Sequence, residues 1–244
     1  MNSSLIDIRN VSKFYGNNIA IKNVSFTVSN GEMIGIAGAS GSGKTTLLNM
    51  ISGLSKPTSG SISIAGHEIS TFKPGKDLAT LVGMIDQQYS LIPELNVINN
   101  VLAGNLGRWN VLKSLISLIF PLERQTVKML LEDLGIGEKI DDKARHLSGG
   151  EQQRVSIARL LLQNPMVVLA DEPVASLDPN RAEDILQLIK SKLVTNNRSV
   201  LITLHNASLI QKYCSRVIGI KEHVIKFDVP SSEITESMLY ELYQ

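Results

Sequence analysis

The segment GASGSGKTT, residues 38–46, constrains this chain more than any other feature of its sequence. It fits the pattern G-x-x-x-x-G-K-[ST], in which glycines let successive backbone N–H groups point inward around an anion. An apolar run over residues 33–37 precedes it, and a helical pattern over residues 44–52 follows it. A strand that leads through such a loop into a helix is typical of the P-loop, which predicts that the chain binds the phosphates of a nucleotide.

The side chains of this loop have separate expected roles. Lys44 would supply a compact positive charge to the outer phosphates, and the Thr45 hydroxyl would be a ligand of Mg²⁺. The alternative is a flexible loop rich in glycine and serine, and the flanking strand and helix argue against it. The predicted phosphate-binding residues are Gly38, Ala39, Ser40, Gly41, Ser42, Gly43, Lys44, Thr45 and Thr46.

Two acidic residues, Asp171 and Glu172, follow an apolar strand pattern over residues 166–170. In open α/β sheets, ligands gather at the carboxyl ends of the strands. Asp171 is therefore expected to hold Mg²⁺ through its water shell, and Glu172 to orient or deprotonate an attacking water. Alone, the pair would be interpreted as a solvated loop, but beside a P-loop the catalytic interpretation is the stronger one.

The segment LSGGEQQR, residues 147–154, leads into a helical pattern over residues 151–163. Ser148 and Glu151 have the spacing of a capping box, which predicts the start of a helix. A cap does not need the two glycines, Gly149 and Gly150, which expose the backbone to another surface, and a glycine-rich helix start can bind an anion. The spacing therefore leaves two interpretations open, a plain helix cap or a second phosphate-facing surface.

The pattern of apolar residues predicts an α/β fold with a mostly parallel sheet. Alternating residues over 5–28 and 61–65 predict antiparallel strands with one exposed face. Short apolar runs over 33–37, 166–170 and 199–204 predict buried parallel strands, and helices are expected over 44–52, 151–163 and 181–194. Residues from about 90 to 145 contain no clear strand, and their leucines and isoleucines have helical spacing, as in an inserted subdomain.

Composition excludes several classes of protein. The chain has 24 Lys and Arg against 23 Asp and Glu, which argues against a nucleic-acid binder that acts through bulk charge. A membrane-spanning helix needs about 20 mostly apolar residues, which no segment supplies, and no signal peptide is recognised. The one cysteine, Cys214, cannot form an internal disulfide, which indicates a reducing compartment, most simply the cytoplasm.

The P-loop, the LSGGE segment and the LADEP segment (residues 169–173) together resemble the nucleotide-binding subunits of ABC transporters, over essentially the whole chain. By this resemblance Tyr15 stacks on adenine, Gln87 reaches Mg²⁺ and the attacking water, and His205 contacts the γ-phosphate. Gln88 is a rival for the role of Gln87. Residues 176–178 match the D-loop.

The resemblance implies a head-to-tail homodimer that holds two ATP molecules and Mg²⁺. Each ATP would lie between the P-loop of one subunit and Ser148, Gly149 and Gly150 of the other. The dimer would move separate integral membrane permease subunits at the cytoplasmic face of the inner membrane, and a solute-binding protein would take part indirectly. Two departures from the family pattern, Glu151 for glutamine and Asn206 for an acidic residue, both keep a polar side chain.

The resemblance also implies a domain organisation. Residues 1–244 would form one ABC ATPase domain, with a β and P-loop core over 1–88 and 160–244. A helical subdomain with the LSGGE segment would cover about 89–159.

Finer similarity favours importers of phosphonate, phosphite or a related phosphorus oxyanion, and it lies in residues 100–109, 170–179, 216–221 and 239–243. Residues 221–223, Lys-Glu-His, depart from the glycine turn that is usual there, in a surface hairpin. One alternative is the ATPase of a lipoprotein-releasing or macrolide-type exporter. Another is a soluble ABC ATPase without a membrane partner, such as an iron–sulfur assembly factor. A P-loop GTPase is disfavoured because the chain contains neither N-K-x-D nor D-x-x-G.

Trp109 and the apolar run over residues 111–120 allow two interpretations. They form either an exposed groove for a short helix of a membrane subunit or the core of the helical subdomain.

Overall fold

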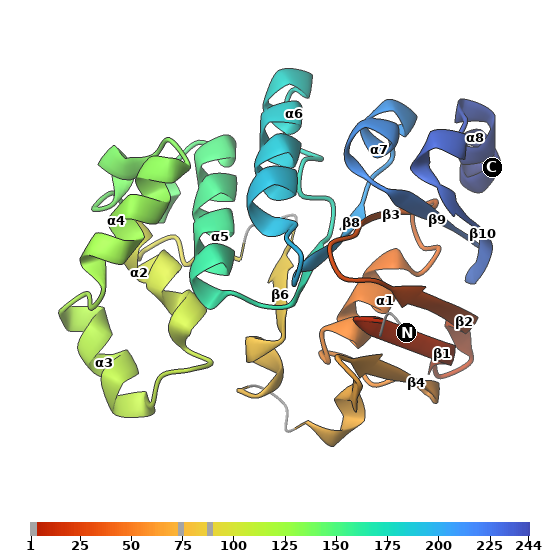
Figure 1. Ribbon diagram of the computed structural model, residues 1–244, viewed down its shortest axis with the longest axis horizontal. Coiled ribbons are helices and arrows are strands. Elements are labelled where there is room, and N and C mark those ends of the chain that lie inside the picture. The colour runs from red at the N-terminus through yellow and green to blue at the C-terminus, as the bar shows by residue number, and fades with distance from the viewer. Residues whose placement is uncertain (1–3, 73–75, 87–89) are drawn as a thin grey trace.

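The computed structural model describes residues 4–72, 76–86 and 90–244, and it contains two sheets with helices between and around them (Figure 1). The first sheet is antiparallel, in the order β2-β1-β4-β5. The second, in the order β10-β9-β3-β8-β7-β6, is parallel except for β10, which pairs antiparallel with β9. The expected α/β class, with a mostly parallel sheet and an antiparallel β unit, is confirmed.

The strands are β1 (Ile6–Tyr15), β2 (Asn18–Val28), β3 (Met33–Ala37), β4 (Ser59–Ile64), β5 (His67–Glu68), β6 (Val82–Ile85), β7 (Val167–Ala170), β8 (Ser199–Thr203), β9 (Arg216–Lys221) and β10 (Val224–Pro230). The α-helices are α1 (Lys44–Ile51), α2 (Val97–Leu102), α3 (Val111–Ile119), α4 (Arg124–Asp133), α5 (Gly149–Gln163), α6 (Pro179–Leu188), α7 (Ala207–Tyr213) and α8 (Glu236–Tyr243).

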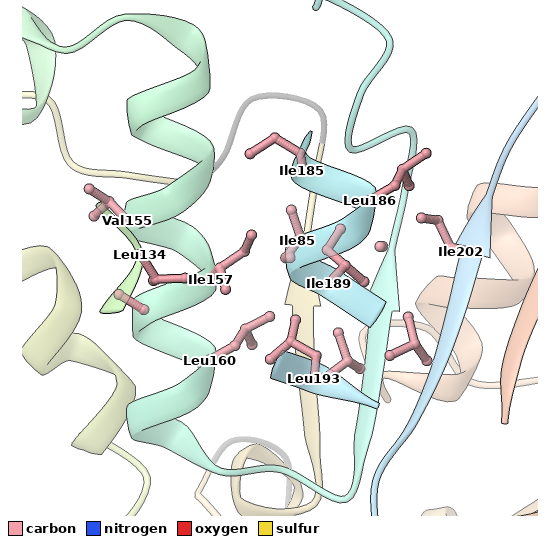
Figure 2. Packing of buried hydrophobic residues seen from close by; sticks show 14 of the residues in the cluster. Ile85, Leu134, Val155, Ile157, Leu160, Ile185, Leu186, Ile189, Leu193 and Ile202 are labelled. Atoms are coloured by element: carbon pink, nitrogen blue, oxygen red, sulfur yellow. The ribbon is translucent and has the colours of Figure 1, made fainter. Parts of the chain in front are cut away.

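Two hydrophobic clusters cover the two faces of the parallel sheet, because its strands are buried on both sides. Along β7, Val167 and Leu169 point to one cluster, whereas Val168 and Ala170 point to the other. The first cluster, which contains Val167 and Leu169, lies between the two sheets and includes the buried side chains of helix α1. The second cluster packs α5, α6, α7 and α8 on the opposite face, and Figure 2 shows the part of it between α5 and α6. Helix α1, which follows the P-loop, is thus packed between the antiparallel sheet and the parallel sheet.

Helices α2, α3 and α4 lie together at the end of the molecule beyond α5 (Figure 1). Trp109 precedes α3 and is only 8% exposed within the second cluster, so the core interpretation is correct for this residue. Helix α3 itself differs, since Ser117 is its one buried residue and its apolar side chains are exposed.

Some boundaries differ from the sequence prediction. The helix expected over 181–194 begins at Pro179, where the Asp178 side chain accepts a hydrogen bond from Arg181 N, and it ends in a π-helix, Ile189–Leu193. The hairpin of β9 and β10 turns through Glu222 and His223, both with positive φ in the place of the expected glycine. Within the described ranges of the chain, the helices are too short or too polar to span a bilayer.

Candidate nucleotide site

The P-loop connects β3 to α1, and two of its glycines are required by close approaches of the backbone. A Cβ on Gly38 would lie 2.3 Å from the Ile220 carbonyl oxygen, and one on Gly43 would lie 2.2 Å from that of Ala20. Gly43 also has φ 109°, which side-chain-bearing residues rarely adopt. The sequence folds in this way because only glycine lets the loop pass so close to β2 and β9.

Lys44 lies inside the loop at the start of α1. Its Nζ donates to the carbonyl oxygens of Gly38 (2.8 Å) and Ala39 (3.0 Å). Burial lowers the pKa of Lys44, and the charges of Glu172 and Asp171 oppose this shift. The neighbouring Ser42 Oγ is buried without a hydrogen-bond partner among the residues that the structure describes. An enclosed cation beside an unsatisfied hydroxyl and a helix N-terminus fits an anionic ligand such as a phosphate.

Asp171 directly follows β7 and is hydrogen-bonded to both the P-loop segment and the end of β8. Its Oδ2 accepts a hydrogen bond from Thr45 Oγ1 at 2.7 Å, and its Oδ1 accepts one from Thr203 Oγ1 at 3.0 Å. Carboxylate and hydroxyl oxygens are the hard ligands that Mg²⁺ prefers. Thr45 and Asp171, predicted separately as metal ligands, therefore lie in contact and fit that ion.

Thr203 is a site residue that the sequence analysis missed. It ends β8, and its hydroxyl also accepts a hydrogen bond from the backbone N–H of Glu172 at 2.6 Å. The only available signal was its position, at the carboxyl end of a predicted buried strand and two residues before His205.

Glu172 and His205, two of the three predicted catalytic residues, are hydrogen-bonded. Glu172 Oε1 lies 2.9 Å from His205 Nε2. The other ring nitrogen, Nδ1, lies 3.0 Å from the hydroxyl of Tyr243 on α8, a contact that the sequence analysis did not identify. Glu172 has φ 49°, a left-handed conformation that is uncommon for a residue other than glycine. Such strain is found at functional sites, where the surrounding structure holds it.

Tyr15 lies at the end of β1, beside the P-loop. A cavity of about 360 Å³ is lined by Tyr15, several P-loop residues and Glu172, with Asn18, Ile19 and Ala20 of β2. Tyr15 is 53% exposed, and Lys13 Nζ lies 4.9 Å from the centre of its ring. An exposed aromatic face next to a phosphate loop is a suitable platform for a nucleobase.

The segment Ser148, Gly149 and Gly150 starts α5 and forms a complete capping box. Ser148 Oγ accepts from the backbone N–H of Glu151, while the Glu151 carboxylate accepts from Ser148 N at 2.7 Å and from Ser148 Oγ at 2.8 Å. These bonds lower the pKa of Glu151. The predicted cap is confirmed.

Beyond the adjacent residues and the backbone of its own helix, a Cβ on Gly150 would meet no described atom within 4 Å, so packing between elements does not require glycine there. The described residues that line the P-loop cavity do not include Ser148, Gly149 or Gly150. The second, phosphate-facing role of this segment therefore needs another molecule. The remaining predicted residue, Gln87, and its rival Gln88 lie outside the described residues.

Comparison with known proteins gives consistent matches. The family described as "ABC transporter" matches residues 21–175. The Phosphonates import ATP-binding protein PhnC of Rhizobium johnstonii is 39% identical over 98% of this chain and 86% of its own length. The protein of the same name from Lactococcus lactis subsp. cremoris is 37% identical over 98% of this chain and 99% of its own.

Solved structures show the same architecture. The structure of cbiO1 from Clostridium perfringens, part of the ABC transporter complex cbiONQ, has a TM-score of 0.80 and 26% identity, covering 94% of this chain and 90% of its own. The dimeric structure of a bacterial ABC transporter cassette has a TM-score of 0.73 and 31% identity, covering 93% and 98% of the two chains.

Proposed function

Since this chain belongs to the ABC transporter family, we propose that it is the ATP-hydrolysing subunit of an importer for a phosphonate or a related phosphorus oxyanion. The observation that carries the hydrolytic part is the meeting of Glu172 and His205 beside the P-loop cavity. Similarity over nearly the whole chain to proteins named for phosphonate import supports the choice of solute.

Residues 38–46 would hold the phosphates, with Lys44 balancing their charge, and the Tyr15 ring would stack on adenine. Thr45 and Asp171, together with Gln87, would hold Mg²⁺, and the ion would neutralise charge on the phosphate oxygens. Glu172 would take a proton from the attacking water as its oxygen bonds to the γ-phosphorus. The bond between the γ-phosphorus and the oxygen that bridges it to the β-phosphate would break, and ADP and phosphate would leave. His205 would donate a hydrogen bond to the γ-phosphate.

Two copies would form a head-to-tail dimer, in which Ser148, Gly149 and Gly150 of one copy close over the ATP of the other. The exposed cap and the open space at Gly150 support this arrangement. Permease subunits would hold the dimer at the cytoplasmic face of the inner membrane, and a solute-binding protein would deliver the phosphonate to them.

We also propose that residues 1–88 and 160–244 are the nucleotide-binding core and that about 89–159 move as a helical subdomain. Helix α5 contacts both α2 and β6, so the second boundary falls inside a helix that belongs to both parts. When the segment of Ser148, Gly149 and Gly150 closes over the ATP of the other copy, α5 would transmit that movement to the parallel sheet.

The assignment of the P-loop as the nucleotide-binding site is tested with the purified chain, ATP and Mg²⁺. Lys44→Ala should weaken ATP binding, because it removes the enclosed cation of the loop, and Lys128→Ala, which removes a lysine on α4, is the matched control. Equal nucleotide affinity of Lys44→Ala and the unmodified chain, measured by calorimetry, would contradict the P-loop assignment.

The solute is tested in cells. A deletion strain should lose growth on a phosphonate as the only phosphorus source and keep growth on inorganic phosphate. The unmodified gene should restore growth, whereas the Glu172→Gln gene should not. Unimpaired growth of the deletion strain on phosphonate would overturn the import assignment and favour an exporter or a soluble ATPase.

A further inference from the structure

Tyr243 contacts the catalytic pair from a part of the chain that contains none of the predicted catalytic residues. Its hydroxyl lies 3.0 Å from His205 Nδ1, and the two ring centres are 5.9 Å apart. The imidazole of His205 thus bridges the Tyr243 phenol and the Glu172 carboxylate. The Gly38 backbone opposes the rise in the pKa of this phenol, which places Tyr243 near the first P-loop glycine as well as beside His205.

Helix α8 holds this phenol in place by packing. Leu239 and Leu242 are buried in the cluster that covers the parallel sheet. Lys221 Nζ, at the end of β9, donates to the Glu241 carbonyl oxygen at 2.6 Å. The Thr235 hydroxyl caps the first turn of the helix. These contacts hold α8 against the sheet up to Leu242, the residue directly before Tyr243, so an anchored helix presents the hydroxyl to His205.

The chemistry of the three groups sets the direction of the hydrogen bonds. An ionised carboxylate is only an acceptor, so His205 Nε2 must carry the proton that binds Glu172. In a neutral imidazole Nδ1 is then the acceptor, and the Tyr243 hydroxyl donates to it. Burial raises the pKa of the Tyr243 phenol, which keeps the proton that this bond requires.

We propose that Tyr243 is a positioning residue that fixes the orientation and the Nε2–H tautomer of His205. This inference rests on the proposed function, in which His205 donates a hydrogen bond to the γ-phosphate. With Nδ1 accepting from the Tyr243 hydroxyl, Nε2–H is the ring donor that could make that bond. A hydrogen bond to one ring nitrogen determines what the other can do. Helix α8, although outside the recognised motifs, then contributes to hydrolysis through His205.

The test compares Tyr243→Phe with Tyr240→Phe. Tyr240 is on the same helix, is 66% exposed and lines the same depression beside His205, so it controls for loss of a hydroxyl from this surface. Tyr243→Phe should lower kcat about 3- to 10-fold, the effect of one neutral hydrogen bond. KM for ATP and the melting temperature should be unchanged, and Tyr240→Phe should resemble the unmodified protein. An unchanged kcat in Tyr243→Phe would overturn the proposal.

A double variant separates positioning from a general effect of the helix. In a His205→Ala background, Tyr243→Phe should cause no further loss, because it acts only through the imidazole. The same fold-loss in both backgrounds would overturn the proposal.

A spectroscopic measurement makes failure of the inference distinguishable from failure of the proposed hydrolysis. The chain has four histidines, so ¹⁵N spectra assigned with His205→Ala can report the two nitrogens of this ring without any turnover. The unmodified protein should show one Nε2–H tautomer. Glu172→Ala, in which only the Tyr243 hydroxyl still favours that tautomer, should show it too, and Glu172→Ala with Tyr243→Phe should show a mixture. A mixture already present in the unmodified protein would overturn the role of Tyr243, whether or not the protein hydrolyses ATP.

Discussion

Glu172 combines a strained backbone with a defined environment. Its left-handed conformation costs on the order of 1–3 kcal/mol, and the hydrogen bond from its N–H to the Thr203 hydroxyl helps to hold it. In this conformation the carboxylate lies 2.9 Å from His205 Nε2. This cost is understandable if the carboxylate must accept a proton at a fixed place beside the P-loop.

We therefore expect Glu172→Gln to lower kcat by about 10²- to 10⁴-fold, the usual contribution of a positioned general base. ATP affinity should be retained, because the amide neither blocks the cavity nor removes Lys44. Steady-state hydrolysis and binding of a fluorescent ATP analogue measure the two effects. Turnover close to that of the unmodified protein would contradict the general-base role.

Because the Ser148 hydroxyl is hydrogen-bonded to the Glu151 carboxylate, a substitution at Ser148 also changes the environment of Glu151. Ser148→Asp can accept from the backbone N–H of residue 151, but its carboxylate would face the Glu151 carboxylate, which now accepts from the Ser148 hydroxyl. Glu151→Gln removes this repulsion. We expect the double variant to fold with a loss of under about 1 kcal/mol, since an aspartate is also a good cap.

The same double variant should lose most ATP hydrolysis, because it places a negative charge against the phosphates bound by the other copy. Glu151→Gln alone is the control and should remain active. Thermal unfolding and turnover are measured on the unmodified protein, on Glu151→Gln and on the double variant. Full activity of Ser148→Asp with Glu151→Gln would show that the segment is only a helix cap.

At the scale of elements, local sequence motifs predicted the P-loop residues of the candidate site. They did not predict the residues that surround Glu172 and His205. The strand β3, the loop and α1 are encoded together, so Lys44 and Thr45 could be assigned. Strand β6 has four residues, one of them glycine, and is too short to show a period. The contacts of Thr203 and Tyr243 arise only when β7, β8 and α8 come together, and no local pattern of residues reports such packing.

Helix α3 is the element whose surface is least explained by the packing of this chain. Its one buried residue is Ser117, and the helix begins at an Asn110 cap. The exposed apolar residues of the helix and its end are Val111, Leu112, Leu115, Ile116, Leu118, Ile119 and Phe120. Because a patch of this kind is typical of a binding surface, we expect a permease subunit to cover it.

Replacing Leu112 and Ile119 together by glutamine should separate docking from folding. Both side chains are exposed, so the melting temperature of the isolated chain should hardly change. Assembly with the permease, measured by co-purification from membranes, should weaken. The control is Trp109→Ala, which removes a core side chain and should cost about 3–5 kcal/mol. Unimpaired assembly, or a stability loss as large as that of Trp109→Ala, would contradict the docking role of α3.

For the whole molecule, the two halves of the proposed ATP site lie on separate exposed surfaces. The P-loop cavity opens between β2, the loop and Glu172, whereas the Ser148 cap lies at the start of α5. Two copies related by a twofold axis can satisfy both surfaces at once, which closes the assembly as a dimer. The net charge of +1 leaves little long-range repulsion between the copies.

ATP should therefore control the oligomeric state. Each bound ATP adds negative charge that two subunits share, and hydrolysis removes that link, so a variant that binds but does not cleave should stay closed. Glu172→Gln with ATP and Mg²⁺ is expected to elute from size exclusion at twice the 26.6 kDa of one chain, and with ADP at the monomer position. Adding the Ser148→Asp and Glu151→Gln changes should keep it monomeric while ATP binding persists. A dimer that forms equally with ADP, or that survives those changes, would show that contacts other than the shared nucleotide hold the copies together.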